Sequence, residues 1–151
     1  MLRWILAAVH LVALGIGLGA VWVRGRALRG RLDTDGLHRV FAADTWWGVA
    51  AFLWISTGLW RLLAGTEKAS QYYLHNHVFW MKMALFGAIF LLEMSPMVTL
   101  VRWRQRVAKG EPVDTHNAAR LAGISVVQAG LVVLVVLAAT AMARGYGAPS
   151  R

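Results

Sequence analysis

Four apolar stretches divide the chain, and each is about long enough to cross a lipid bilayer. They cover approximately residues 4–23, 45–63, 78–101 and 121–143. Roughly 20 apolar residues in a helix span the ~30 Å of bilayer hydrocarbon. Helices are expected because every backbone N–H and C=O group in lipid must be paired within the protein. The pattern therefore predicts an all-α integral membrane four-helix bundle, forming a single domain over residues 1–151.

The composition agrees with a membrane protein whose expected partner is the lipid bilayer. Apolar residues make up 58% of the 151 residues and charged residues 15%, against ~45–50% and ~25% in soluble domains. The absence of cysteine excludes thiolate metal sites and haem attachment through a CxxCH motif. The net charge of +9 does not indicate nucleic-acid binding, because the basic residues gather at the ends of the apolar stretches. This placement suits anionic lipid headgroups and topology signals.

Basic residues are concentrated in two of the three connections between these stretches. The positive-inside rule places such connections in the cytoplasm. Both termini then lie on the outer side, which is the periplasmic side of a bacterial inner membrane. The basic residues of the first connection are Arg24, Arg26, Arg29, Arg31 and Arg39, and those of the third are Arg102, Arg104, Arg106, Lys109 and Arg120.

Three ionisable residues, His10, Lys82 and Glu93, interrupt the apolar stretches. Such residues are costly in lipid and are functional candidates by default. With a rise of ~1.5 Å per residue, His10 lies roughly 5 Å and Lys82 about 11 Å to the outer side of their helix centres. A lysine stem of ~6 Å brings its ammonium near the level of the imidazole. Ser56 and Thr57 of the second stretch fall at a similar depth. We therefore expect a proton-handling or cofactor site, unless Lys82 extends to the headgroups and His10 bonds a backbone carbonyl.

Glu93 follows Lys82 by eleven residues, almost three helical turns, so both occupy one face of the third helix. Gln128 in the fourth stretch has a similar depth and is placed to hydrogen-bond Glu93. Burial without a cation would favour a neutral carboxyl, which suits proton movement along the bundle. The alternative is a structural contact of Glu93 with Gln128 or with an arginine at the inner edge.

His75 and His77 lie just before the third stretch, on the outer side. Neutral imidazoles are good ligands for copper or zinc, so these two histidines and His10 form the predicted metal ligands. His77 is also a candidate contact for a cofactor bound below it. The alternative is an exposed polar loop.

Small residues in the first stretch suggest a helix contact. Gly15 and Gly19 are four residues apart, a spacing that lets two helix backbones approach closely. The partner is either another helix of the bundle or a second copy of the chain in a homodimer.

The chain resembles an uncharacterised family of predicted bacterial membrane proteins of about this length. The likeness covers nearly the whole chain and implies a four-helix membrane protein. The segments that carry it are WILAAVHLVALGIGLGAVWVRGRALRG, AADTWWGVAAFLWISTGLWR, FWMKMALFGAIFLLEMSPMVTLVRWR and the terminal AMARGYG.

A second resemblance is to the membrane-bound, flavin-free protoporphyrinogen oxidases and the related copper-resistance D-type proteins. His10, in the setting Ala8-Val9-His10-Leu11, matches a histidine of the first helix of those oxidases. Lys82 corresponds to the lysine of their W-x-x-K pattern, although this chain reads Phe79-Trp80-Met81-Lys82. The connection after the first helix also differs. The resemblance implies that His10 and Lys82 bind haem b or act on a tetrapyrrole.

Three functions follow as expectations for a bacterial inner-membrane protein. The first is a haem- or tetrapyrrole-associated oxidoreductase that uses His10 and Lys82. The interior of the other helices offers no second histidine, so the haem would be five-coordinate or use His77 or a methionine as sixth ligand. The second function is copper handling, and the third is a non-enzymatic structural subunit.

Overall fold

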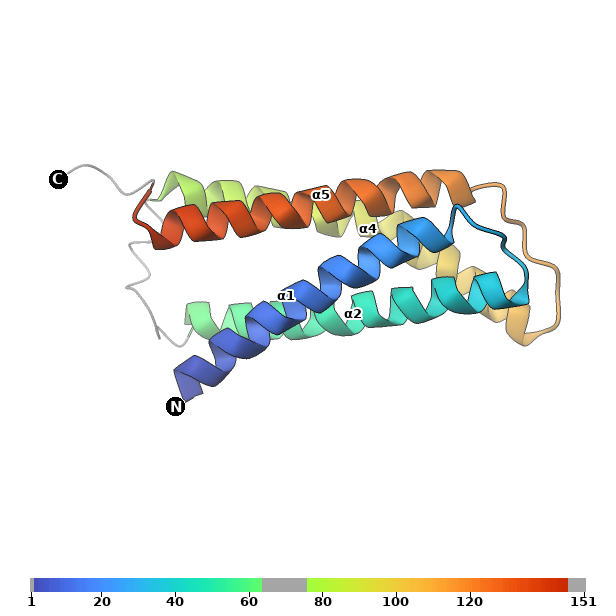
Figure 1. The fold of residues 1–151 in the computed structure, drawn as a ribbon, viewed down its shortest axis with the longest axis horizontal. Coiled ribbons are helices and arrows are strands. Elements are labelled where there is room, and N and C mark those ends of the chain that lie inside the picture. Colours follow the sequence, from blue (N-terminus) through green and yellow to red (C-terminus); the bar gives the residue numbers. More distant parts are fainter. Residues whose placement is uncertain (1, 64–75, 147–151) are drawn as a thin grey trace.

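The computed structural model describes residues 2–63 and 76–146 (Figure 1). The helices are α1 (Leu2–Ala27), α2 (Thr34–Leu63), α4 (His77–Ala108) and α5 (Ala118–Ala143). The described ranges contain no strand. The predicted all-α four-helix fold is therefore confirmed.

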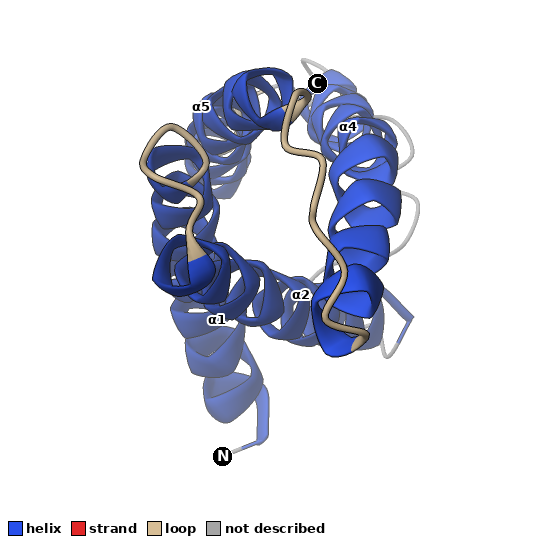
Figure 2. Cartoon of the chain, turned by 90° about the vertical axis from the view of Figure 1, so that its right-hand side faces the viewer, coloured by secondary structure: helices blue, strands red, loops and turns tan. Residues whose placement is uncertain are grey.

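The helices run alternately in opposite directions and form a ring (Figures 1 and 2). α1 packs against α2 and α5, and α5 packs against α4. The backbones of α2 and α4 lie further apart, and side chains bridge them. The start of α1 and the end of α5 lie at one end of the bundle (Figure 1). The connections 28–33 and 109–117 lie together at the other end, which we call the connection end.

Three of the helices are long and apolar enough to cross a membrane. They are α1, α4 and α5, whose apolar windows have mean hydropathies of 2.2, 1.9 and 2.5. The second predicted span, 45–63, lies in α2 but does not reach this level. It contains four tryptophans, two glycines, a serine and two threonines among its aliphatic residues, and these lower its hydropathy. α2 nevertheless lies beside α1 along the bundle (Figure 1).

Two helices extend well beyond the apolar stretches from which they were predicted. α2 begins at Thr34, eleven residues before residue 45, and α4 continues to Ala108. The side chain of Asp33 supports the start of α2 by accepting a hydrogen bond from the Gly36 N–H at 2.9 Å, as helix-capping residues do. Several arginines assigned to connections are therefore helical, and they are Arg24, Arg26, Arg39, Arg102, Arg104, Arg106 and Arg120.

Two clusters of buried apolar side chains form the core. The first lies toward the connection end and includes Leu28, Leu37, Val40, Phe41, Leu100, Trp103, Ala118, Leu121 and Ala122. The second lies toward the middle of the bundle and includes Ala20, Val21, Trp47, Ile89, Ala129, Val132 and Val135. On each helix, a short interval of sequence separates the two clusters. Five polar residues occupy that interval, and they are Arg24, Asp44, Glu93, Ser125 and Gln128.

The glycines of α1 divide between two faces of the helix. Gly17 is buried against α2, where a Cβ atom would lie 3.4 Å from both Ala50 Cβ and Trp47 Cζ3. Gly15 and Gly19 are exposed, and a Cβ at either would meet no other atom within 4 Å. The internal contact of α1 therefore uses Gly17 rather than the predicted pair. A homodimer through Gly15 and Gly19 stays a prediction.

We predict that Gly17→Leu lowers the free energy of unfolding by about 1–3 kcal/mol, the usual effect of overpacking a core. The matched control is Gly15→Leu, which adds the same side chain to the same helix on its exposed face. Reversible unfolding in lipid or mild detergent measures both variants. Equal losses in the two variants would show that α1 does not pack on α2 in this register.

Candidate functional site

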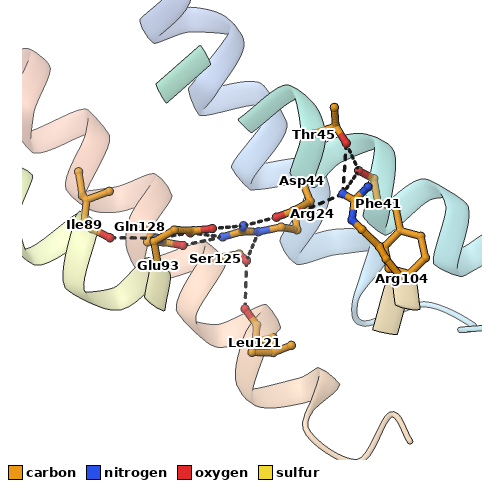
Figure 3. Close-up of polar contacts among 10 residues, drawn as sticks. All are labelled: Arg24, Phe41, Asp44, Thr45, Ile89, Glu93, Arg104, Leu121, Ser125 and Gln128. Atoms are coloured by element: carbon orange, nitrogen blue, oxygen red, sulfur yellow. Dashed lines mark hydrogen bonds and ion pairs between the residues drawn. The ribbon is translucent and has the colours of Figure 1, made fainter. Parts of the chain in front are cut away.

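The guanidinium of Arg24 lies in the centre of the bundle, fully buried (Figure 3). Its Nε donates to Ser125 Oγ at 3.1 Å. Nη1 donates to Asp44 Oδ1 at 2.9 Å and to Glu93 Oε1 at 2.8 Å. Nη2 donates to Glu93 Oε2 and Gln128 Oε1, both at 2.8 Å. A guanidinium has five N–H donors, so every donor has an acceptor, and the acceptors lie on the other three helices.

The acceptors around Arg24 are in turn held by their own partners. Gln128 Nε2 donates to Glu93 Oε2 at 2.8 Å and to the Ile89 carbonyl at 3.2 Å. Ser125 Oγ donates to the Leu121 carbonyl one turn earlier in α5. Gln128 thereby joins α5 to α4 independently of the arginine. The cluster has few polar atoms left without a partner, which is the condition under which buried polar groups stabilise a fold.

A second arginine extends the cluster toward the connection end. Arg104 Nη2 on α4 donates to Asp44 Oδ2 at 3.0 Å, so Asp44 lies between two guanidinium groups. Charges therefore alternate in the order Glu93, Arg24, Asp44, Arg104, and their formal sum is zero (Figure 3). The side chains of Asp44 and Glu93 are only 18% and 20% exposed. This balance makes the burial of Arg24 beside the two mostly buried carboxylates tolerable.

We define the Arg24 cluster as Arg24, Asp44, Glu93, Arg104, Ser125 and Gln128. Apart from Arg104, the cluster lies between the two apolar core clusters, because Val21 precedes and Leu28 follows Arg24, and Ile89 precedes and Leu100 follows Glu93. The surroundings therefore have a low dielectric constant, in which an unpaired charge is expensive.

The sequence predicted part of this cluster. The expected Glu93–Gln128 hydrogen bond is confirmed, and the alternative that Glu93 pairs with an arginine is the arrangement found. Arg24 itself was assigned to the first connection, and this assignment was wrong because α1 continues to Ala27. The spacing of the sequence does indicate that Arg24 is buried, since it continues the buried face of Ala13, Gly17 and Val21 at helical intervals.

His10 belongs to a separate polar group between α1 and α2. Trp54 Nε1 donates to His10 Nε2 at 2.9 Å. An indole N–H is only a donor, so Nε2 accepts, and the neutral ring carries its proton on Nδ1. Nδ1 then donates to Thr57 Oγ1 at 2.8 Å, and the threonine hydroxyl donates to the Leu53 carbonyl. Both ring nitrogens of His10 are therefore engaged with α2.

Of the residues expected at the depth of His10, the described contacts include Thr57. The Lys82 ammonium lies 5.4 Å from the centroid of the Phe79 ring on its own helix. The two described hydrogen bonds of the His10 ring are made with α2, at Trp54 and Thr57. Thr57 contacts His10 as its depth suggested, whereas Ser56 is exposed. Trp54 is the contact that the sequence did not indicate, although it lies one turn before Thr57.

The two polar groups are separated along the bundle. His10 and Arg24 are fourteen residues apart, which is roughly 21 Å along a helix. The interval is filled by buried apolar side chains, among them Ala13, Val21, Trp47 and Ala50. Such an interval supplies no hydrogen-bonded route between the imidazole and the carboxylates. The proton path predicted to link Glu93 with His10 therefore has no support from these positions.

The predicted metal ligands are placed only in part. His75 lies outside the described residues, and His77 is the exposed first residue of α4. Among residues 2–63 and 76–146, no group of three or more histidine, aspartate or glutamate side chains is arranged to hold a metal ion. Asn76, which precedes His77, is buried and caps α4 by accepting hydrogen bonds from the Val78 and Phe79 N–H groups. Metal binding by His10, His75 and His77 stays a prediction.

The surroundings of His10 do not fit a haem in this arrangement. An axial ligand needs a free ring nitrogen lone pair, and the Nε2 lone pair already accepts from Trp54. Gly58 packs against the ring, since a Cβ atom there would lie 3.4 Å from His10 Cε1. A cavity of about 10 Å³ lined by Trp54 and Ala13 lies nearby, room for about one water molecule. Haem binding would therefore require Trp54 to turn away from His10.

A larger groove of about 430 Å³ lies at the connection end, far from His10. Leu32, Leu37 and Phe41 line it together with His38 and Glu111. The neighbouring connection contains Asp114, whose pKa is lowered because the His116 backbone N–H and side chain hydrogen-bond its carboxylate. Asp114 and His116 are exposed to solvent, whereas Phe41 in the groove is buried and contacts Arg104 of the Arg24 cluster.

We predict that Arg24→Gln lowers the free energy of unfolding by about 3–5 kcal/mol, because it leaves the Glu93 carboxylate without its cation and Asp44 with Arg104 alone. Arg26→Gln is the matched control, since Arg26 is exposed on the same turn of α1 and surface changes are usually within about 0.5 kcal/mol. Unfolding measured in the same lipid compares the two. Similar stabilities for both variants would mean that Arg24 is not buried among these carboxylates.

Comparison with protein families gives one match. A model of a family described as a predicted membrane protein, DUF2214, matches residues 2–147. Neither the curated proteins nor the solved structures contain a match to this chain. The family description agrees with the three helices that are apolar enough to cross a membrane.

Proposed function

We propose that this chain, which belongs to the DUF2214 family of predicted membrane proteins, is a structural, non-catalytic subunit of the bacterial inner membrane. In this proposal the Arg24 cluster fixes the positions of four helices relative to one another. The bundle then presents a defined lipid-facing and loop surface to the rest of a membrane assembly.

One observation carries this proposal: all five N–H donors of Arg24 are used by groups of α2, α4 and α5. A site that binds a substrate or moves protons needs an open donor, an open acceptor or a group free to change its charge. Here each carboxylate oxygen of Glu93 and Asp44 accepts from an arginine. The closed arrangement around Arg24 supports a role in holding the helices together.

A tetrapyrrole-associated redox function, with haem b as cofactor, is the second candidate. The observation that favours it is the neutral imidazole of His10 inside a membrane helix, held by an indole N–H rather than a carboxylate. The resemblance of the Ala8–Leu11 segment and of Lys82 to the flavin-free protoporphyrinogen oxidases points to the same two residues. Such a role requires His10 to exchange Trp54 for an iron or a porphyrinogen.

The visible absorption spectrum of the full chain, purified from its host membrane, separates the two candidates. The structural proposal predicts no Soret band, no uptake of added haem, and the same spectrum for His10→Ala. Thr57→Val is the matched control, because it removes the other partner of His10 and leaves the imidazole in place. A Soret band that is lost in His10→Ala and kept in Thr57→Val would overturn the structural proposal in favour of the tetrapyrrole.

A further inference from the structure

Arg104 is the one arginine of the Arg24 cluster that reaches the surface. Its side chain is 38% exposed, whereas that of Arg24 is fully buried. It projects from α4 toward α2, on the side of the ring where the two backbones lie further apart (Figures 2 and 3). Arg104 therefore connects the buried charges with the outside of the bundle.

The hydrogen bonds of Arg104 leave three of the five N–H groups of its guanidinium available. Nη2 makes all of the described contacts, donating to the Phe41 carbonyl at 2.7 Å, to Asp44 Oδ2 at 3.0 Å and to Thr45 Oγ1 at 3.1 Å. A guanidinium also carries one N–H on Nε and two on Nη1. Within the described part of the chain, these three N–H groups have no acceptor.

The guanidinium is held in one position although part of it is exposed. The Arg104 Cζ atom lies 4.9 Å from the centroid of the Phe41 ring, which is a cation–π contact. The Phe41 backbone carbonyl accepts from Nη2, and Asp44 holds the same nitrogen. A fixed, planar fork of N–H donors matches the geometry of a phosphate, and it loses less freedom on binding than a mobile side chain.

The depth of Arg104 matches the headgroup layer. It lies three residues beyond Val101, the end of the third apolar stretch, or about 4.5 Å further along the helix axis. Glu93 lies eleven residues earlier, well inside the stretch. Exposed Trp46, at 58%, lies next to Thr45 on the facing helix, and tryptophan is enriched at membrane interfaces.

Arg104 also shares its carboxylate partner with another arginine. Asp44 is its only anionic partner among the described residues, and Asp44 pairs with Arg24 as well. Glu93 already binds Arg24 through both carboxylate oxygens. An additional anion on the open N–H groups of Arg104 would therefore complete its pairing without breaking any contact of the cluster.

We infer that Arg104 forms a binding site for the phosphate of an anionic phospholipid, at the edge of the bundle between α2 and α4. The phosphate oxygens accept from Nε and Nη1, while Nη2 stays on Phe41, Asp44 and Thr45. The acyl chains lie along the apolar surface of α4, where Val98 and Val101 are exposed. The inference does not depend on the proposed structural function, because it concerns a lipid ligand and not the role of the bundle.

Native mass spectrometry of the full chain with phosphatidylglycerol tests this inference. We expect one phosphatidylglycerol retained per chain, and about tenfold weaker retention by Arg104→Gln, as for the loss of one charge-assisted pair. Arg104→Lys keeps the charge toward Asp44 but removes the fork, and it too should retain less lipid. The matched control is Arg120→Gln, which removes an exposed charge from α5 at the same end and should retain the lipid normally.

Two further measurements of lipid retention identify the source of the phosphate. Phosphatidylcholine, which has no net charge, should be retained more weakly than phosphatidylglycerol, and 10-fold excess inorganic phosphate should not displace the bound lipid. Displacement by inorganic phosphate would overturn the lipid assignment. Equal retention by the wild type, Arg104→Gln and Arg104→Lys, or an equal loss in Arg120→Gln, would overturn the site.

Discussion

The five hydrogen bonds of Arg24 are the interaction on which the rest of the bundle depends. One guanidinium on α1 reaches Asp44 on α2, Glu93 on α4, and Ser125 and Gln128 on α5. Apolar contacts between membrane helices are weakly specific, because lipid tails are as apolar as the side chains. A polar group that must be satisfied at one position therefore determines how the four helices align along their axes.

The apolar layers and the charged layer support each other. Small residues such as Gly17 and Ala20 let α1 approach its neighbours closely enough for the arginine to reach across the bundle. The apolar clusters on both sides exclude water and strengthen the ion pairs. The His10 group lies at another position along the bundle axis, where it joins α1 to α2 through Trp54 and Thr57.

The sequence was sufficient to predict the helices and one contact of the cluster. Apolar length located all four helices, and matching depth paired Glu93 with Gln128. Helix ends were missed because α2 and α4 continue into polar sequence, where hydropathy no longer marks them. Arg24 was missed for the same reason, since positive charge at the end of a stretch is also the usual topology signal. The partners of His10 depend on side-chain directions in α2, which spacing alone does not give.

A double-mutant cycle between Arg24 and Glu93 tests the central claim most directly. The free energy of unfolding is measured in one bilayer composition for the wild type, Arg24→Gln, Glu93→Gln and the double variant. If the two side chains form the buried pair that aligns the helices, the double variant loses much less stability than the sum of the single losses, with a coupling energy of about 1–3 kcal/mol. Additive losses, with a coupling energy near zero, would contradict the account.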